Sequence, residues 1–95
     1  MTLDDYVVDI LMRDLVGHDH QPTSFLVYLW FSYEAGRSRR ERVSVSYQTI
    51  ADSVGVSKSA AQTGVRWLLR RKLIEMRKST PTAVPAYRVL RPWRD

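Results

Sequence analysis

Two short amphipathic segments separated by one glycine, within residues 46–71, constrain the fold of this chain most. Ser46 and Ser57 each precede one of these segments, where a hydroxyl can accept a hydrogen bond from the free amides of a helix start. Gly55 lies between the segments and can adopt the positive φ that turns a chain sharply. Ala51 is small enough to lie where two helices cross at a steep angle. These features predict two helices joined by a tight turn.

Residues 1–17 predict one further helix. Thr2 can provide its N-cap, aspartates follow in the first turn, and Gly17 can end it. One set of apolar residues recurs at three- and four-residue steps, which is typical of one face of an amphipathic helix: Leu3, Tyr6, Val7, Ile10, Leu11 and Leu15. The spacing of four aspartates predicts the solvent-facing side: Asp4, Asp5, Asp9 and Asp14.

The run Phe25–Phe31 is apolar on every side. Its length, with a cap at Thr23 and an end at Gly36, predicts a buried helix over 24–36; a buried strand is the alternative. A membrane span needs roughly 20 apolar residues, far more than this run contains. The chain has no cysteine, and its N-terminus lacks the basic segment that opens a secretory signal. We therefore expect a soluble, cytoplasmic protein that has no membrane partner.

Alternating residues near the C-terminus predict a β-hairpin over 73–90. Its strands are expected at 73–78 and 86–90, and the loop between them, 79–85, contains two prolines. Residues 43–46 also alternate, but over so few positions that only a short edge strand is expected there. The predicted fold class is mainly α with a small β-hairpin.

Charge divides the chain into two parts. Residues 1–36 contain one basic and six acidic residues (net −5), whereas residues 37–95 contain fourteen basic and four acidic residues (net +10). A polyanion is the expected partner of the second part, and a solvated basic face is the alternative. Four arginines at its start form either a phosphate-binding strip or a solubilising loop: Arg37, Arg39, Arg40 and Arg42.

This basic part resembles a bacterial winged helix-turn-helix domain. The motif residues are Ser46-Tyr-Gln-Thr-Ile-Ala51, Gly55-Val-Ser57, Val65-Arg-Trp-Leu68 and Leu73-Ile74, and Tyr87–Trp93 is similar to the second wing strand. The resemblance covers about 24–93, and it implies one winged helix-turn-helix domain over 1–95 with an extra helix at 1–17. Two positions depart from the family pattern. Lys72 stands where a helix-capping glycine is usual, and Gly64 stands inside a helix where alanine is more usual.

The resemblance implies that helix 57–71 enters the major groove of double-stranded DNA. It also implies that the 74–90 wing touches the backbone or the minor groove, and that the protein is a sequence-specific transcriptional regulator. The candidate contacts on the helix start at its N-terminus and follow its outward positions: Ser57, Lys58, Ser59, Gln62, Thr63, Arg66 and Arg70. At the wing tip the candidates are Arg77, Lys78, Ser79 and Thr80.

Two other functions are compatible with the sequence: a winged helix that binds another protein, and a module of plasmid or phage replication machinery. We expect no enzyme and no cofactor, because no pattern of catalytic residues or phosphate-binding glycines stands out. His18 and His20 flank Asp19 without an evident third ligand, so no metal site is expected. The apolar stripe of helix 1–17 predicts a homodimer through that helix, and packing within its own chain is the alternative.

The three tryptophans are expected in different surroundings. Trp30 is expected in the core, Trp67 half-exposed against the wing, and Trp93 docked on the domain. Their spacing is not that of a platform on which the bases of a single strand stack.

Overall fold

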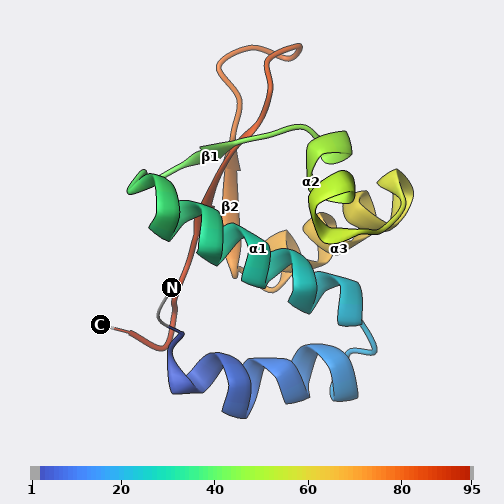
Figure 1. Cartoon of the computed structure of the whole chain (residues 1–95), viewed down its shortest axis with the longest axis vertical. Coiled ribbons are helices and arrows are strands. Elements are labelled where there is room, and N and C mark those ends of the chain that lie inside the picture. The colour runs from blue at the N-terminus through green and yellow to red at the C-terminus, as the bar shows by residue number, and fades with distance from the viewer. Residues whose placement is uncertain (1–2, 95) are drawn as a thin grey trace.

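The computed structural model describes residues 3–94 and is mainly helical, with a small three-stranded antiparallel sheet (Figure 1). The elements in chain order are η1 (Val7–Leu11), η2 (Arg13–His18), α1 (Pro22–Ser38), β1 (Val43–Ser44), α2 (Tyr47–Val54), α3 (Lys58–Arg70), β2 (Ile74–Arg77) and β3 (Ala86–Val89). The predicted mainly α class with a small hairpin is confirmed. The strand alternative for Phe25–Phe31 is wrong, because this run lies within α1.

The N-terminal helix, η1 followed by η2, is wound largely as a π-helix, with hydrogen bonds from residue i+5 to residue i. Its buried residues accordingly repeat every four positions: Val7, Leu11 and Leu15. Leu3 and Tyr6 of the predicted stripe are exposed, and Ile10 is half-buried. The predicted end at Gly17 is wrong, since η2 continues to His18 and the chain turns at His20, whose φ is 56°. Thr2, the predicted cap, lies outside the described residues.

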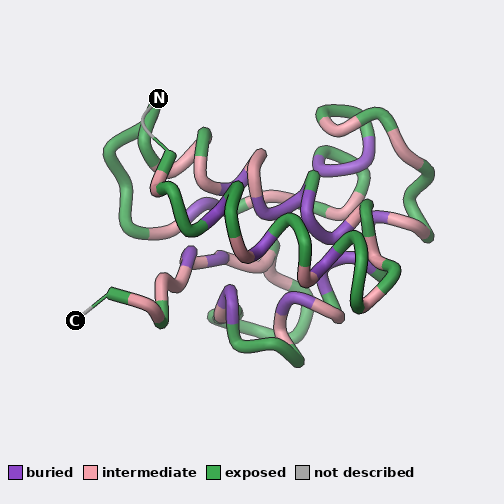
Figure 2. The backbone as a smooth tube through the Cα atoms, turned by 90° about the horizontal axis from the view of Figure 1, so that it is seen from below, coloured by how far each residue is buried: buried purple, intermediate pink, exposed green. Residues whose placement is uncertain are grey.

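Helix α1 is longer than predicted at both ends. It begins with Pro22, which has no amide to satisfy, so the helix starts without the predicted cap from Thr23. Gly36 stays helical, and α1 ends instead where Arg39 adopts the left-handed conformation with a φ of 54°. The buried residues, purple in Figure 2, gather in the middle of the molecule, and α1 contributes the largest share of them: Ser24, Phe25, Val27, Tyr28 and Phe31. Trp30, expected in the core, is half-buried.

The sheet has the strand order β1-β3-β2. In its register, Val43 lies opposite Tyr87, and Ile74 lies opposite Val89. All four of these side chains are buried, so this face of the sheet closes the core under the helices. The hairpin prediction is confirmed with slightly shorter strands. Within residues 3–94, no helix combines the length and the apolar character that crossing a membrane requires.

Candidate nucleic-acid interface

The turn between α2 and α3 has the geometry that its sequence predicts. Ser46 Oγ accepts a hydrogen bond from the amide of Thr49 at 3.2 Å and caps α2. Gly55 has a φ of 88°, and its amide donates to the carbonyl of Ala51 at 2.8 Å. Ser57 then caps α3. Ala51 is buried, so the small side chain lies at the crossing and α3 is held at a fixed angle to α2.

Lys72 ends α3 in the left-handed conformation that glycine usually provides. Its φ is 57°. The amide of Leu73 donates to the carbonyl of Leu68 at 3.0 Å, and the amide of Lys72 donates to that of Leu69 at 3.1 Å. These two bonds form a Schellman motif. The departure from the family pattern therefore leaves the helix end intact and adds backbone strain at a lysine.

Gly64 lies where α3 crosses the start of α1. Its carbonyl accepts a hydrogen bond from Ser24 Oγ at 3.2 Å, and Ser24 is buried. A Cβ atom at position 64 would lie 3.4 Å from Thr23 Cγ2 and 3.6 Å from the backbone of Ser24. The glycine thus permits the close approach of two helices, and an added Cβ would lie in ordinary van der Waals contact with α1.

Most of the predicted contact residues of α3 lie on its exposed face. At 3.6 residues per turn, four of them follow one line along the helix: Ser59, Thr63, Arg66 and Arg70, all exposed. Lys58 is exposed to one side of this line, and Gln62 is half-buried. The opposite face is buried at Ala61, Gly64, Val65 and Leu68. The helix therefore presents a polar, basic ridge to solvent.

Three of the predicted contact residues of α3 and its cap already have side-chain partners within the chain. Ser57 Oγ accepts the amide of Ala60 at 3.1 Å and lies 3.3 Å from Ser59 Oγ. The guanidinium of Arg70 lies 5.2 Å from the ring centroid of Trp67, a cation–π contact. Ser57 is thus first a capping residue, and the guanidinium of Arg70 is held against Trp67.

The β2–β3 loop carries the remaining candidates. Arg77 pairs with Ala86 in the hairpin register, so residues 78–85 form the loop, which projects from the body of the molecule (Figure 1). Four candidates are exposed there: Arg77, Lys78, Ser79 and Thr80. Helix α3 and this loop therefore offer two separate basic surfaces to solvent.

Ion pairs separate the arginines into two groups. Five arginines pair with carboxylates of the same chain: Arg37 with Glu34, Arg42 with Glu75, Arg71 with Asp19, Arg88 with Glu41, and Arg94 with Asp4. Within residues 3–94, no carboxylate lies within 4.0 Å of the five cations of the candidate interface: Lys58, Arg66, Arg70, Arg77 and Lys78. These five cations thus lack a close ion pair within residues 3–94, as do some cations elsewhere, such as Arg40 and Arg91.

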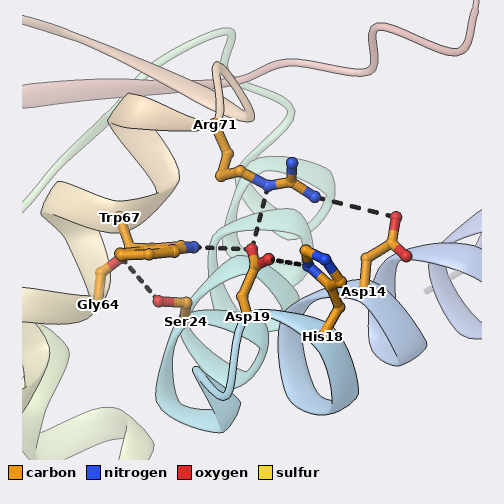
Figure 3. Close-up of polar contacts among 7 residues, drawn as sticks. All are labelled: Asp14, His18, Asp19, Ser24, Gly64, Trp67 and Arg71. Atoms are coloured by element: carbon orange, nitrogen blue, oxygen red, sulfur yellow. Dashed lines mark hydrogen bonds and ion pairs between the residues drawn. The ribbon is translucent and has the colours of Figure 1, made fainter.

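Asp19 is a structural residue that sequence analysis missed (Figure 3). Its Oδ2 accepts a hydrogen bond from Trp67 Nε1 at 2.8 Å and lies 3.1 Å from Arg71 Nε, and its Oδ1 lies 2.9 Å from His18 Nδ1. Burial alone would raise the pKa of Asp19, but the hydrogen bonds from His18 and Trp67 and the charge of Arg71 outweigh it. The pKa therefore lies below the ordinary value. This carboxylate fixes the end of η2 to α3.

Trp67 was predicted to pack against the wing, and this is wrong. Its indole N–H is directed to Asp19, on the side of α3 that faces the N-terminal helix. The reason is chemical, because a partly buried indole N–H needs an acceptor, and Asp19 provides one. The two residues lie 48 positions apart, so local sequence contained no signal for this contact.

The start of the N-terminal helix is attached in a similar way. Asp4 accepts a hydrogen bond from Trp93 Nε1 at 2.9 Å and from Arg94 Nε at 2.7 Å. Trp93 stacks on Tyr6 with ring centroids 4.5 Å apart. The expected docking of Trp93 is confirmed. The prediction that Asp4 belongs to a purely solvent-facing side is wrong, because the carboxylate holds the C-terminal segment.

The described residues contain no cluster of three or more His, Cys, Asp or Glu side chains arranged to hold a metal ion. Comparison of the chain with known protein families, with curated proteins and with solved structures finds no match. The class that the structure defines is therefore a mainly helical fold with a three-stranded antiparallel sheet, which presents a basic helix and a basic hairpin loop.

Proposed function

We propose that this chain is a winged helix-turn-helix protein that binds a specific sequence of double-stranded DNA. In this proposal it is a transcriptional regulator and not an enzyme. The observation that carries the proposal is the uncompensated positive charge of α3 and the β2–β3 loop, in a chain that pairs other arginines with carboxylates. DNA phosphates are the partner that such a surface favours. The capped turn before α3 supports the assignment, because it fixes the basic helix on a rigid support.

In this proposal α3 enters the major groove and the β2–β3 loop, as the wing, contacts the backbone or the minor groove. Arg66 lies at the middle of the exposed ridge and can donate two hydrogen bonds to guanine, while Thr63 beside it can contact a base or a phosphate. Lys58, Lys78 and Arg77 are suited to phosphates. Gln62 is half-buried, so we assign it a smaller share of base recognition than Arg66.

The experiment that tests the proposal is the salt dependence of duplex binding. Five uncompensated cations should give a log–log slope of about −4 to −5, at about −0.9 per phosphate contact. Gel shifts between about 50 and 200 mM salt measure this slope, and Arg94→Ala, which removes a cation that Asp4 already pairs with, is the control that should leave it unchanged. A flat dependence, or no binding at micromolar protein, would contradict the proposal and indicate a protein partner.

We also propose that two copies associate through the N-terminal helix, by a face other than the stripe that the sequence suggested. Val7, Leu11 and Leu15 are buried within the chain, whereas Val8, Met12 and Val16 form an exposed apolar column, 45%, 40% and 38% accessible. Asp9 and Arg13 are exposed beside this column. In an antiparallel pair around a two-fold axis, Asp9 of each copy would face Arg13 of the other, so the charges favour a second copy.

Sedimentation at tens of micromolar tests this association. The wild-type chain should sediment as a dimer, and Met12→Asp should be monomeric because it buries a charge in the interface. Leu26→Asp is the matched control, since Leu26 is equally exposed and apolar but lies on α1; it should remain dimeric. Circular dichroism of each variant checks the fold. A wild-type monomer of 11.1 kDa at this concentration would contradict the dimer.

A further inference from the structure

A hollow lined by three arginines lies away from the candidate interface. It has a volume of about 340 Å³ and lies between the C-terminal end of α1, the segment after it, and β3. Ala35, Gly36 and Val89 are its small and apolar lining residues, and the guanidinium groups belong to Arg40, Arg88 and Arg91. Ligand sites in proteins start at about 300 Å³, combine apolar walls with a few polar groups, and are concave. The hollow reaches this volume, but its lining is more charged than such a site usually is, since it contains one carboxylate, Glu41, beside the three arginines.

The charge of the hollow is only partly compensated. Arg88 lies 3.4 Å from Glu41 and 3.6 Å from Glu75. Within the described part of the chain, Arg40 and Arg91 have no carboxylate within 4.0 Å. The negative end of the α1 dipole attracts a basic residue that follows the helix, which explains a cation at Arg40 without any ligand. It does not account for Arg91, which follows β3.

The backbone beside the hollow is strained. Arg39 adopts a φ of 54°, which is left-handed and costs a non-glycine residue on the order of 1 kcal/mol. This turn reverses the chain so that Arg40 and Glu41 lie next to Ala35 and Gly36. Strained non-glycine positions gather at sites that hold ligands. The turn at Arg39 places Arg40 in the lining of the hollow.

The hollow is distant from the ridge of α3. Helix α1 crosses α3 at Ser24, and Gly36 lies twelve residues further along α1. At 1.5 Å per residue this is about 18 Å along the helix axis. In Figure 1 the end of α1 and the α2–α3 pair lie on opposite sides of the molecule. A group bound in the hollow would therefore be a separate contact, not part of the one that α3 makes.

We propose that this hollow binds the phosphate group of a nucleotide through the guanidinium groups of Arg40, Arg88 and Arg91. Guanidinium groups present paired N–H donors that match phosphate oxygens, and the hollow contains arginine but no lysine. The apolar lining accepts the sugar or base that accompanies the phosphate. The nucleotide is either free or part of a nucleic-acid backbone. The second case rests on the proposed function, whereas the first does not.

Amide chemical shifts of the full chain test the proposal in two arms, with adenosine 5′-monophosphate and with a duplex of about two helical turns. Either ligand should give saturable shifts around Arg40, Arg88 and Arg91. Arg40→Ala/Arg91→Ala should weaken mononucleotide binding about tenfold or more, because it removes charge-assisted hydrogen bonds. The matched control is Lys72→Glu, which lowers the net charge by the same two units at one exposed position outside the hollow and should bind as the wild type does.

The arms separate the two sources of phosphate. Saturation by the mononucleotide assigns a free nucleotide. A nucleic-acid backbone is assigned if the amides shift with the duplex alone. In that case the log–log salt slope of duplex binding should be about two units shallower in Arg40→Ala/Arg91→Ala, the hollow variant, than in the control. Duplex binding that leaves these amides unshifted, with no response to the mononucleotide, overturns this inference and leaves the proposed function intact. Saturation by the mononucleotide without any duplex binding supports this inference and overturns the proposed function. Equal losses in the hollow variant and the control also overturn the inference.

Discussion

Lys72 ends α3 in a conformation that lysine adopts only at a cost. The left-handed region brings Cβ close to the backbone carbonyl, and the penalty for a residue with a side chain is about 1–2 kcal/mol. The two hydrogen bonds of the Schellman motif, from Lys72 and Leu73, outweigh this penalty in the folded chain. The end of α3 therefore has both hydrogen bonds of a Schellman motif but a strained backbone at Lys72.

Lys72→Gly should raise the free energy of unfolding by about 1 kcal/mol, because glycine removes the strain and loses part of the gain to its greater freedom when unfolded. Urea denaturation measures the change. Lys72→Ala is the control, since it removes the same charge and keeps a Cβ; it should show no gain. Equal stability of the glycine and alanine variants would show that the left-handed strain is negligible.

Residue-level predictions succeeded where the signal was local. Ser46 and Ser57 cap their helices because the acceptor and the amide lie three residues apart. The helix ends at Gly17 and Gly36 were wrong, since the left-handed turns belong to His20 and Arg39. A glycine permits a helix to end, but tertiary packing of the next segment decides where it does.

At the scale of elements, α3 and the β2–β3 loop present two basic surfaces that differ in what each can recognise. A rigid helix that fits the major groove can distinguish base edges, whereas a loop that reaches the backbone meets the same phosphates in every sequence. Arg66 on α3 and Lys78 on the loop are exposed and unpaired within residues 3–94. Substitutions at these two positions therefore compare the contributions of the two surfaces to binding.

If α3 reads bases as proposed, Arg66→Ala should weaken binding to a selected DNA site by about 1–3 kcal/mol and change binding to random duplex much less. Arg77→Ala/Lys78→Ala should weaken both duplexes alike, because it removes phosphate contacts. Competition titrations on both duplexes measure the four affinities. If Arg66→Ala weakens the two duplexes equally, α3 does not read bases.

The elements themselves were largely predictable, since periodicity indicates a helix or a strand without reference to its neighbours. The contacts between the elements could not be predicted in this way. The apolar stripe of the N-terminal helix was assigned to a partner as well as to the chain, and the structure buries Val7, Leu11 and Leu15 within the chain. Periodicity identifies an apolar face but not what covers it. The hollow at Arg88 and Arg91 was missed for the same reason, because β3 and the end of α1 meet only in the fold.

At the scale of the whole molecule, the N-terminal helix and the β2–β3 loop are far apart, whereas other residues of the basic part contact the N-terminal helix. The N-terminal helix and the β2–β3 loop occupy the two ends of the longest axis, which extends 37 Å (Figure 1). Carboxylates of the acidic part, Asp4 and Asp19, hold the body through hydrogen bonds and ion pairs. Their charged forms stabilise the attachment of the helix, so the attachment depends on pH.

The stability of the wild-type chain should fall as the pH drops below about 4. The pKa of Asp19 is lower in the folded chain than its ordinary value of 3.8, so the unfolded chain binds the proton first and acid favours unfolding. Asp19→Asn should lower the free energy of unfolding by about 1.5–3 kcal/mol at neutral pH, because the hydrogen bonds to the charged carboxylate are lost. In acid, the stability of this variant should fall less steeply than that of the wild type. Thermal unfolding between pH 3 and 7 measures both effects.

Asp5→Asn is the control for this comparison, because Asp5 is exposed at the start of the same helix. It should follow the wild-type pH profile. An Asp19→Asn variant with the wild-type acid profile would show that the carboxylate of Asp19 does not hold the helix.

The contact of Asp4 with Trp93 and Arg94 spans about ninety positions of the chain, and it sets an order of events during translation. Residues emerge from the ribosome in sequence, and a domain completes its folding only when its parts are available. Helix α1, α2 and α3 can pack as soon as residue 70 has emerged. The N-terminal helix is made before α1, but it can gain its anchor at Asp4 only after residues 93 and 94 have left the exit tunnel, so this anchor forms after α3 has been made.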